Sequence, residues 1–325
     1  MTSAHASLVD ELCDGDTRAL ARAITHIEDR APGYRDLVAE LHRRGTGADV
    51  VGVTGSPGSG KSTLVDRLTA TYREAGETVG VLAIDPSSPF SGGAVLGDRI
   101  RMGSAVGDDG VFVRSMSARG RLGGLSSATA DAVKALDAAG MDRIIIETVG
   151  AGQNEVDIVR TADTVLVLVP PQSGDTVQML KAGILEIADV FVVNKADLPG
   201  ADRIVEELTE LIRLDPAVDE GEGWEVPIVE TVAAEGRGVG DLRGAIADHR
   251  RHLTDSGEGE ARRRRRYAEE LRTIVREELA DLATAEFEAR GGLDELAATI
   301  AARETDPYAV SEEVIAPIRD CVDGR

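Results

Sequence analysis

The chain has 325 residues, of which 42% are hydrophobic, so it is long enough for one large core with appended segments. Its formal net charge of -22 at pH 7 argues against general nucleic-acid binding, because most of such a surface would repel a phosphate backbone. The sequence contains no apolar run of membrane-spanning length and no signal peptide at its start. We therefore expect a soluble, cytoplasmic protein whose partners include neither nucleic acid nor membrane.

The first 48 residues predict a helical N-terminal extension. Asp16 is a helix-capping residue type, and Pro32 is a residue type that favours the first turn of a helix. Apolar residues at helical spacing follow each of them. They are Leu20, Ala23, Ile24 and Ile27 after Asp16, and Leu37, Val38 and Leu41 after Pro32.

Residues 49–252 predict an α/β domain, because short β-branched runs alternate there with longer helical segments. Alternation of this kind is typical of a mainly parallel sheet with helices on both faces. The predicted strands are residues 50–53, 79–84, 111–113, 143–146, 164–169, 190–193 and 226–229.

A glycine-rich phosphate loop follows the first of these strands and leads into a helix. Its backbone N–H groups can turn toward a polyphosphate, and the positive end of the helix dipole faces the same anion. Lys61 can reach the β and γ oxygens of a nucleotide, and Ser62 offers a hydroxyl to Mg²⁺. The loop consists of Gly55, Ser56, Pro57, Gly58, Ser59, Gly60, Lys61, Ser62 and Thr63.

Two segments at strand ends predict a guanine site. Asn194, Lys195 and Asp197 come directly after the predicted strand 190–193, at the end where open α/β sheets bind ligands. The carboxylate of Asp197 can accept hydrogen bonds from N1–H and the 2-amino group of guanine, a donor pair that adenine lacks. Residues Thr231, Val232 and Ala233 end the next strand and are placed to donate a backbone N–H to the guanine carbonyl, although they also fit an ordinary strand end.

Three carboxylates fall on the phosphate side of the predicted sheet: Asp85, Asp98 and Glu147. Oxygen ligands of this kind suit Mg²⁺, and we interpret them as contacts to the ion rather than as solvated turns. Glu147 begins the segment Glu-Thr-Val-Gly, in which the N–H of Gly150 can touch a γ-phosphate.

The last part of the chain, residues 253–325, predicts a helical arm. Residues 254–259 read as a linker, and two shorter helical segments follow Gly292 and Val310. The basic run 262–266 precedes Glu269 and Glu270 and is interpreted as a solvated, salt-bridged helix face rather than an RNA site. A long amphipathic helix between these segments needs a partner surface for its apolar stripe, Tyr267, Leu271, Ile274, Val275, Leu279 and Leu282.

Several longer motifs resemble the methylmalonyl-CoA mutase-associated GTPases, the MeaB/ArgK-type P-loop GTPase family. They are GSPGSGKST from residue 55, DPSSPFSGGAVLGDRIRM from residue 85, GRLGGL from residue 120, ETVGAGQNE from residue 147 and GILEIADVFVVNKAD from residue 183. The resemblance covers about residues 49–250. It implies a GTPase domain over 49–252, Mg²⁺ near Asp85, Asp98 and Glu147, and a dimerisation arm over 253–325.

The same resemblance implies a function and a switch. The family members are chaperones that gate adenosylcobalamin loading and protect methylmalonyl-CoA mutase, so GTP, GDP and Mg²⁺ are the expected cofactors and a homodimer the expected assembly. Asp175, Gln178 and Lys181 match a switch loop that communicates with the mutase, and Lys61, Glu147, Gly150 and Lys181 are the expected catalytic residues. Two alternatives stay open: a P-loop kinase, which has no need of a guanine-reading segment, and a nickel-inserting GTPase, which needs His or Cys ligands.

Overall fold

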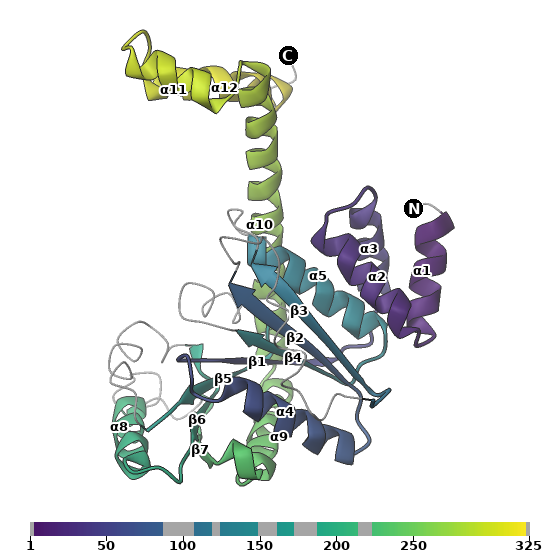
Figure 1. Cartoon of the computed structure of the whole chain (residues 1–325), viewed down its shortest axis with the longest axis vertical. Coiled ribbons are helices and arrows are strands. Elements are labelled where there is room, and N and C mark those ends of the chain that lie inside the picture. Colours follow the sequence, from purple (N-terminus) through teal and green to yellow (C-terminus); the bar gives the residue numbers. More distant parts are fainter. Residues whose placement is uncertain are drawn as a thin grey trace. The chain divides into compact units, whose positions relative to one another are not determined.

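A computed structural model of the chain describes residues 3–86, 107–118, 124–148, 161–171, 187–213 and 223–322. The chain divides into two compact units, Met1–Arg266 and Tyr267–Arg325. The first contains the sheet and the N-terminal helices, and the second is helical (Figure 1). The predicted three-part division at residues 48 and 252 stays a prediction.

The first unit is built on a seven-stranded sheet in the order β3-β2-β4-β1-β5-β6-β7. All of its strand pairs are parallel, which confirms the predicted fold class. The sheet contains β1 (Asp49–Gly55), β2 (Val79–Pro86), β3 (Val111–Ala118), β4 (Arg143–Thr148), β5 (Thr164–Val169), β6 (Val190–Asn194) and β7 (Ile228–Thr231). The carboxyl ends of all seven strands therefore lie at the same edge of the sheet, and the predicted phosphate and base motifs follow strands that end there.

Helices cover both faces of this sheet, because the strands carry apolar side chains toward both faces. On one face, Val51, Val53 and Ile145 pack in a core with α4 (Lys61–Glu74) and α9 (Val239–Asp255). The opposite face carries α1 (Ser3–Cys13), α2 (Thr17–Glu28), α3 (Tyr34–Arg44), α5 (Gly124–Ala138) and α8 (Ala201–Arg213). Figure 1 shows α1, α2 and α3 grouped beside α5.

The N-terminal extension is helical as predicted, with two differences. Asp16 caps α2 by accepting from the N–H groups of Arg18 and Ala19 at 2.7 and 3.0 Å, and these backbone bonds lower the pKa of its carboxyl. Pro32 does not open α3, because Gly33 adopts a φ of +85° at the N-cap and the helix begins at Tyr34. Helix α1 was not predicted at all.

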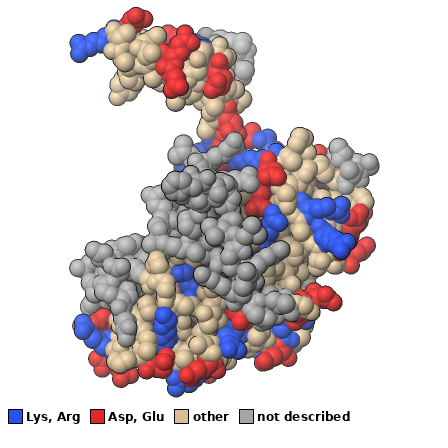
Figure 2. Space-filling model, in the orientation of Figure 1, with Lys and Arg blue, Asp and Glu red and all other residues tan. Residues whose placement is uncertain are grey.

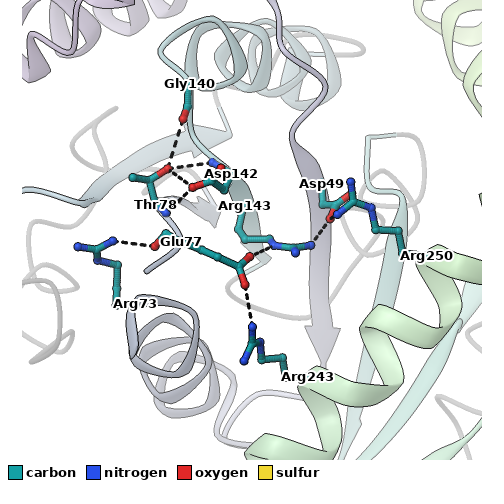
Figure 3. Close-up of polar contacts among 9 residues, drawn as sticks. All are labelled: Asp49, Arg73, Glu77, Thr78, Gly140, Asp142, Arg143, Arg243 and Arg250. Atoms are coloured by element: carbon teal, nitrogen blue, oxygen red, sulfur yellow. Dashed lines mark hydrogen bonds and ion pairs between the residues drawn. The ribbon is translucent and has the colours of Figure 1, made fainter. Parts of the chain in front are cut away.

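A chain of ion pairs ties the amino ends of the strands together (Figure 3). Arg143, at the start of β4, lies between the carboxylates of Glu77 and Asp49. Glu77 also accepts from Arg243 at 2.8 Å, and Asp49 pairs with Arg250, both from α9. One planar guanidinium thus bridges two carboxylates at the edge opposite the polar motifs.

Tyr72 lies buried beneath this network. The guanidinium groups of Arg143 and Arg243 lie 5.2 and 5.6 Å from the centre of its ring. Burial raises the pKa of Tyr72 to about 12.

On the visible face of the molecule, acidic and basic side chains are interspersed over the described surface (Figure 2).

The helical segments near the end of the chain differ from the prediction at their boundaries. The predicted linker over 254–259 is wrong for most of its length, because α9 continues to Asp255 and α10 (Glu258–Ala289) starts after Ser256 and Gly257. Helices α11 (Leu293–Ala301) and α12 (Pro307–Val322) follow. The side chains of the predicted apolar stripe of α10 are exposed in the single chain: Tyr267, Leu271, Ile274, Val275, Leu279 and Leu282.

The basic run 262–266 is only partly the solvated face that the sequence predicts. Arg262 pairs with Asp189 at 2.8 Å, and Arg266 pairs with Asp163 at 3.0 Å and donates to the carbonyl of Thr161 at 2.8 Å. These arginines fix the first turns of α10 to the amino ends of β5 and β6. Their sequence neighbours Arg263, Arg264 and Arg265 are exposed.

The junction at Asp189 is buried and charged. One carboxylate oxygen of Asp189 lies 2.8 Å from Arg262 and 3.2 Å from Nε2 of the fully buried His249, while the other accepts from the N–H of Val165 at 2.8 Å. Burial alone would raise the pKa of Asp189, but His249 and Arg262 outweigh it and hold the pKa below its usual range.

We predict that Asp189→Asn lowers the free energy of unfolding at pH 7 by about 1.5–3 kcal/mol, because it removes a charged hydrogen-bond acceptor. A depressed folded-state pKa stabilises the fold above the unfolded pKa of about 3.9, and this stabilisation disappears as the pH falls through the folded pKa. Urea unfolding at pH 7 and below pH 4 measures both effects. The exposed Asp255→Asn is the control, and a difference that does not shrink at low pH contradicts the prediction.

Candidate functional site

The phosphate loop has the strand-loop-helix context that its mechanism requires, since β1 ends at Gly55 and α4 begins at Lys61. Three of its glycines adopt positive φ: +140° at Gly55, +75° at Gly58 and +94° at Gly60. A Cβ at Gly55 would lie 2.3 Å from the carbonyl oxygen of Leu168. A Cβ at Gly58 would meet nothing within 4 Å, so the described chain leaves space over this part of the loop.

Lys61 and Ser62, the first two residues of α4, make the side-chain contacts of the phosphate loop that bear on its chemistry. The ammonium group of Lys61 is buried and donates to the carbonyl oxygens of Gly55 and Ser56 at 2.7 and 3.0 Å. The hydroxyl of Ser62 donates to Glu147 at 2.6 Å, although 85 residues separate them in sequence. The structure therefore brings the predicted magnesium ligands Ser62 and Glu147 together at the carboxyl ends of β1 and β4.

Asn194 and Lys195 connect the predicted base-reading segment to the phosphate loop. The buried amide of Asn194 donates to the carbonyl of Ser59 at 2.8 Å. Lys195 adopts a φ of +62°, and its ammonium donates to the carbonyl of Gly58 at 2.8 Å. Gly60 is required here, because a Cβ at this position would lie 2.4 Å from the Asn194 amide nitrogen.

The amide oxygen of Asn194 holds the second predicted base segment. It accepts from the hydroxyl of Thr231 and from the N–H of Ala233, both at 3.1 Å. The N–H of Val232 donates to the carbonyl of Arg237 at 3.0 Å. Donation from residues 231–233 to guanine stays a prediction, and the N–H groups of Val232 and Ala233 already have acceptors within the chain.

Asp197, the predicted guanine reader, is exposed three residues beyond the buried Asn194. Five other predicted site residues lie outside the described residues: Asp98, Gly150, Asp175, Gln178 and Lys181. Asp85 is described only through its backbone, at the carboxyl end of β2 opposite Ser117 of β3. The assignments of these residues stay predictions.

The described residues fit a magnesium-bound nucleotide. The Ser62 hydroxyl and Glu147 carboxylate that meet at the loop are oxygen donors, which a hard cation prefers. Within the described part of the chain, the buried hydroxyls of Ser56 and Ser59 have no hydrogen-bond partner. Unpaired buried polar groups are rare and call for an explanation. In a phosphate-binding loop, the bound anion would supply the missing hydrogen-bond partner.

Sequence reasoning missed one pair of residues at this edge. Thr54 and Thr148 are buried, and their hydroxyl oxygens lie 3.2 Å apart. A threonine at the end of a strand is common, so the residue type alone gives no signal. Position in the sequence does give a signal, because Thr54 directly precedes Gly55 of the phosphate loop and Thr148 lies within the segment that Glu147 begins.

Comparison with known proteins decides the family. Residues 20–288 match the family described as Methylmalonyl Co-A mutase-associated GTPase MeaB. The chain belongs to this family. It is 46% identical over 311 residues to a relative from Pyrococcus abyssi that carries a GTPase name, with 96% of each chain covered.

Two further proteins extend the comparison. The chain is 31% identical over 287 residues to the mouse "Methylmalonic aciduria type A homolog, mitochondrial", covering 83% of this chain and 69% of that protein. The crystal structure of LAO/AO transport system kinase matches with a TM-score of 0.70 and 26% identity, over 98% of this chain and 99% of that one. These findings confirm the predicted family and the P-loop NTPase fold, and membership of a GTPase family implies guanine nucleotide binding.

We predict that Asp197→Asn weakens GTP binding by about 1–3 kcal/mol, because it removes the charged acceptor for the two guanine donors. Binding of a xanthosine nucleotide should improve, since xanthine presents a carbonyl where guanine has its amino group. Competition against a fluorescent GDP analogue measures both affinities. Unchanged GTP affinity contradicts the assignment, and the exposed Asp202→Asn in α8 is a matched control.

Proposed function

We propose that this MeaB-family protein is a GTP-hydrolysing chaperone that gates adenosylcobalamin loading of methylmalonyl-CoA mutase and protects that enzyme. The observation that carries the GTPase part is the link from the phosphate loop through Asn194 to the base-reading segment. The mutase partner rests on the family description and on the name of the mouse relative. The activity is hydrolysis of GTP to GDP and phosphate.

Hydrolysis in this site is a matter of positioning and charge neutralisation. Lys61 is held against the loop backbone, where its ammonium can meet the β and γ oxygens. Mg²⁺, when bound, neutralises charge on those oxygens, and Ser62 and Glu147 would hold it with Asp85 and Asp98 as further carboxylates. The segment from Glu147 to Gly150 would sense the γ-phosphate, and we expect slow hydrolysis in the absence of the partner.

The runner-up is a P-loop kinase, which transfers the γ-phosphoryl group to an acceptor other than water. The base-reading segment disfavours a kinase that uses ATP. A competition assay between ATP and GTP for the nucleotide site distinguishes the two functions. A preference for ATP supports the kinase and contradicts the proposal.

A direct test measures single-turnover GTP hydrolysis with and without methylmalonyl-CoA mutase. We expect the mutase to accelerate hydrolysis by the wild type. Lys181→Ala should keep the basal rate and lose the acceleration, because Lys181 is proposed to belong to the switch read by the mutase. Equal stimulation of both proteins rejects the switch, equal loss of both rates places Lys181 in catalysis, and a wild type that the mutase neither binds nor stimulates contradicts the chaperone function.

We also propose that the exposed stripe of α10 forms a homodimer contact, since a helix face this apolar is rarely left in water. Leu271→Asp combined with Leu279→Asp should convert the dimer to a monomer that still binds GDP. Ala280→Asp is the control, because Ala280 is exposed and lies two and a half turns from Leu271, on the opposite side of the helix. Light scattering gives the molar mass, and a monomeric wild type contradicts the proposal.

A further inference from the structure

The sheet has a seam at its carboxyl edge between β4 and β1. On one side lie β3, β2 and β4, with the acidic residue Glu147, and on the other lie β1, β5, β6 and β7, with the phosphate loop and the base-reading segment. Backbone pairing between β1 and β4 ends at Val53 and Glu147. Each strand remains paired to its outer neighbour for at least one further residue, Thr148 with Ile84 of β2 and Thr54 with Val167 of β5.

Two hydroxyl groups join the strands just beyond the point where the backbone ladder ends. The Thr148 hydroxyl lies 3.2 Å from the hydroxyl oxygen of Thr54 and 3.4 Å from the carbonyl oxygen of Val53. Thr54 is 0% and Thr148 is 3% exposed, so water does not compete for these bonds. Since a hydroxyl donates one proton and accepts at its oxygen, Thr148 can bond the Val53 carbonyl while Thr54 donates to Thr148.

The link between Ser62 and Glu147 lies on the opposite face of the sheet. Successive strand residues point to opposite faces, so the side chains of Glu147 and Thr148 leave β4 on different sides. Glu147 reaches the residue that follows Lys61, and Thr148 reaches the residue that precedes Gly55. The last two residues of β4 therefore hold both ends of the phosphate loop.

We propose that Thr148 is a positioning residue for GTP hydrolysis, which fixes the acidic end of β4 relative to the phosphate loop through its hydroxyl contacts to Thr54 and Val53. This inference rests on the proposed function. Small displacements of a positioned group cost large factors in rate, whereas nucleotide affinity depends on many contacts that this link does not make. Loss of the link should therefore slow the reaction more than it weakens binding.

Two substitutions at Thr148 separate this role from ordinary packing. Thr148→Val keeps the shape and removes the hydroxyl, while Thr148→Ser keeps the hydroxyl and removes a methyl group. We expect Thr148→Val to lower kcat about tenfold with KM for GTP and the Kd for GDP changed less than about twofold. Thr148→Ser should recover most of the rate, and Thr54→Val added to Thr148→Val should cost little more, because both remove one link.

The control is Thr69→Val in α4, which removes a buried hydroxyl that has no hydrogen-bond partner in the described residues. Its kcat should match the wild type. Thermal unfolding and GDP binding verify that each variant is folded.

Three results overturn the inference: wild-type kcat in Thr148→Val, equal loss of rate in Thr148→Ser and Thr148→Val, or a parallel loss of GDP affinity that indicates a damaged site. A wild type that binds GTP without hydrolysing it contradicts the proposed function, and the positioning role with it. A wild-type rate that survives Thr148→Val rejects the positioning role alone.

Discussion

The buried side chain of Asn194 is the interaction on which the arrangement of the site depends. Its amide nitrogen holds the phosphate loop at Ser59, and its oxygen holds the segment after β7 at Thr231 and Ala233. One planar group thus sets the distance between the part of the site that meets phosphate and the part that meets the base. Because no water reaches it, loss of either contact would leave a buried polar atom unpaired. Gly60 is constrained by the same contact, since it must leave room for the amide.

The two edges of the sheet use polar groups in different ways. At the amino edge, charged side chains form ion pairs: Arg143 bridges Glu77 and Asp49, and Asp189 pairs with Arg262. At the carboxyl edge, the buried Ser56 and Ser59 hydroxyls have no partner among the described residues. The ion pairs at the amino edge hold the ends of the strands, whereas the two serine hydroxyls lie in the loop that would meet a phosphate. The ion pairs at the amino edge support the sheet without taking part in the chemistry of the carboxyl edge, whereas α4 contributes Lys61 and Ser62 to it.

The sequence predicts the parts of this protein that depend on local pattern. Parallel strands, the cap at Asp16 and the strand-loop-helix around Lys61 all follow from residue types at short spacing. Ser62 and Glu147 are predicted to share a magnesium ion, although the direct bond between them is not predicted. The contacts that the sequence does not predict at all also join distant segments: Thr148 to Thr54, and Arg262 to Asp189. Arg262 and Arg266 belong to a run that the sequence predicts to be solvated, but they pair with Asp189 and Asp163 and hold the first turns of α10. A linker was predicted from Gly and Ser at 254–259, but two residues suffice to separate the helices, and packing of Leu253 extends α9 past the predicted boundary.

Arginine and lysine side chains are used differently at the two edges of the sheet. The chain has 36 basic residues of the Lys and Arg type, and only Lys61, Lys134, Lys181 and Lys195 are lysines. Where a charge must bridge two acceptors in fixed geometry, as at Arg143, the planar fork of arginine is used. Lys61 and Lys195 instead donate to carbonyl oxygens of the phosphate loop from compact, rotatable ammonium groups. An ammonium can exchange a carbonyl for a phosphate oxygen by a small rotation of its stem, while a guanidinium held by two partners cannot move without breaking both bonds, so lysine is the residue type that suits a loop whose ligand comes and goes.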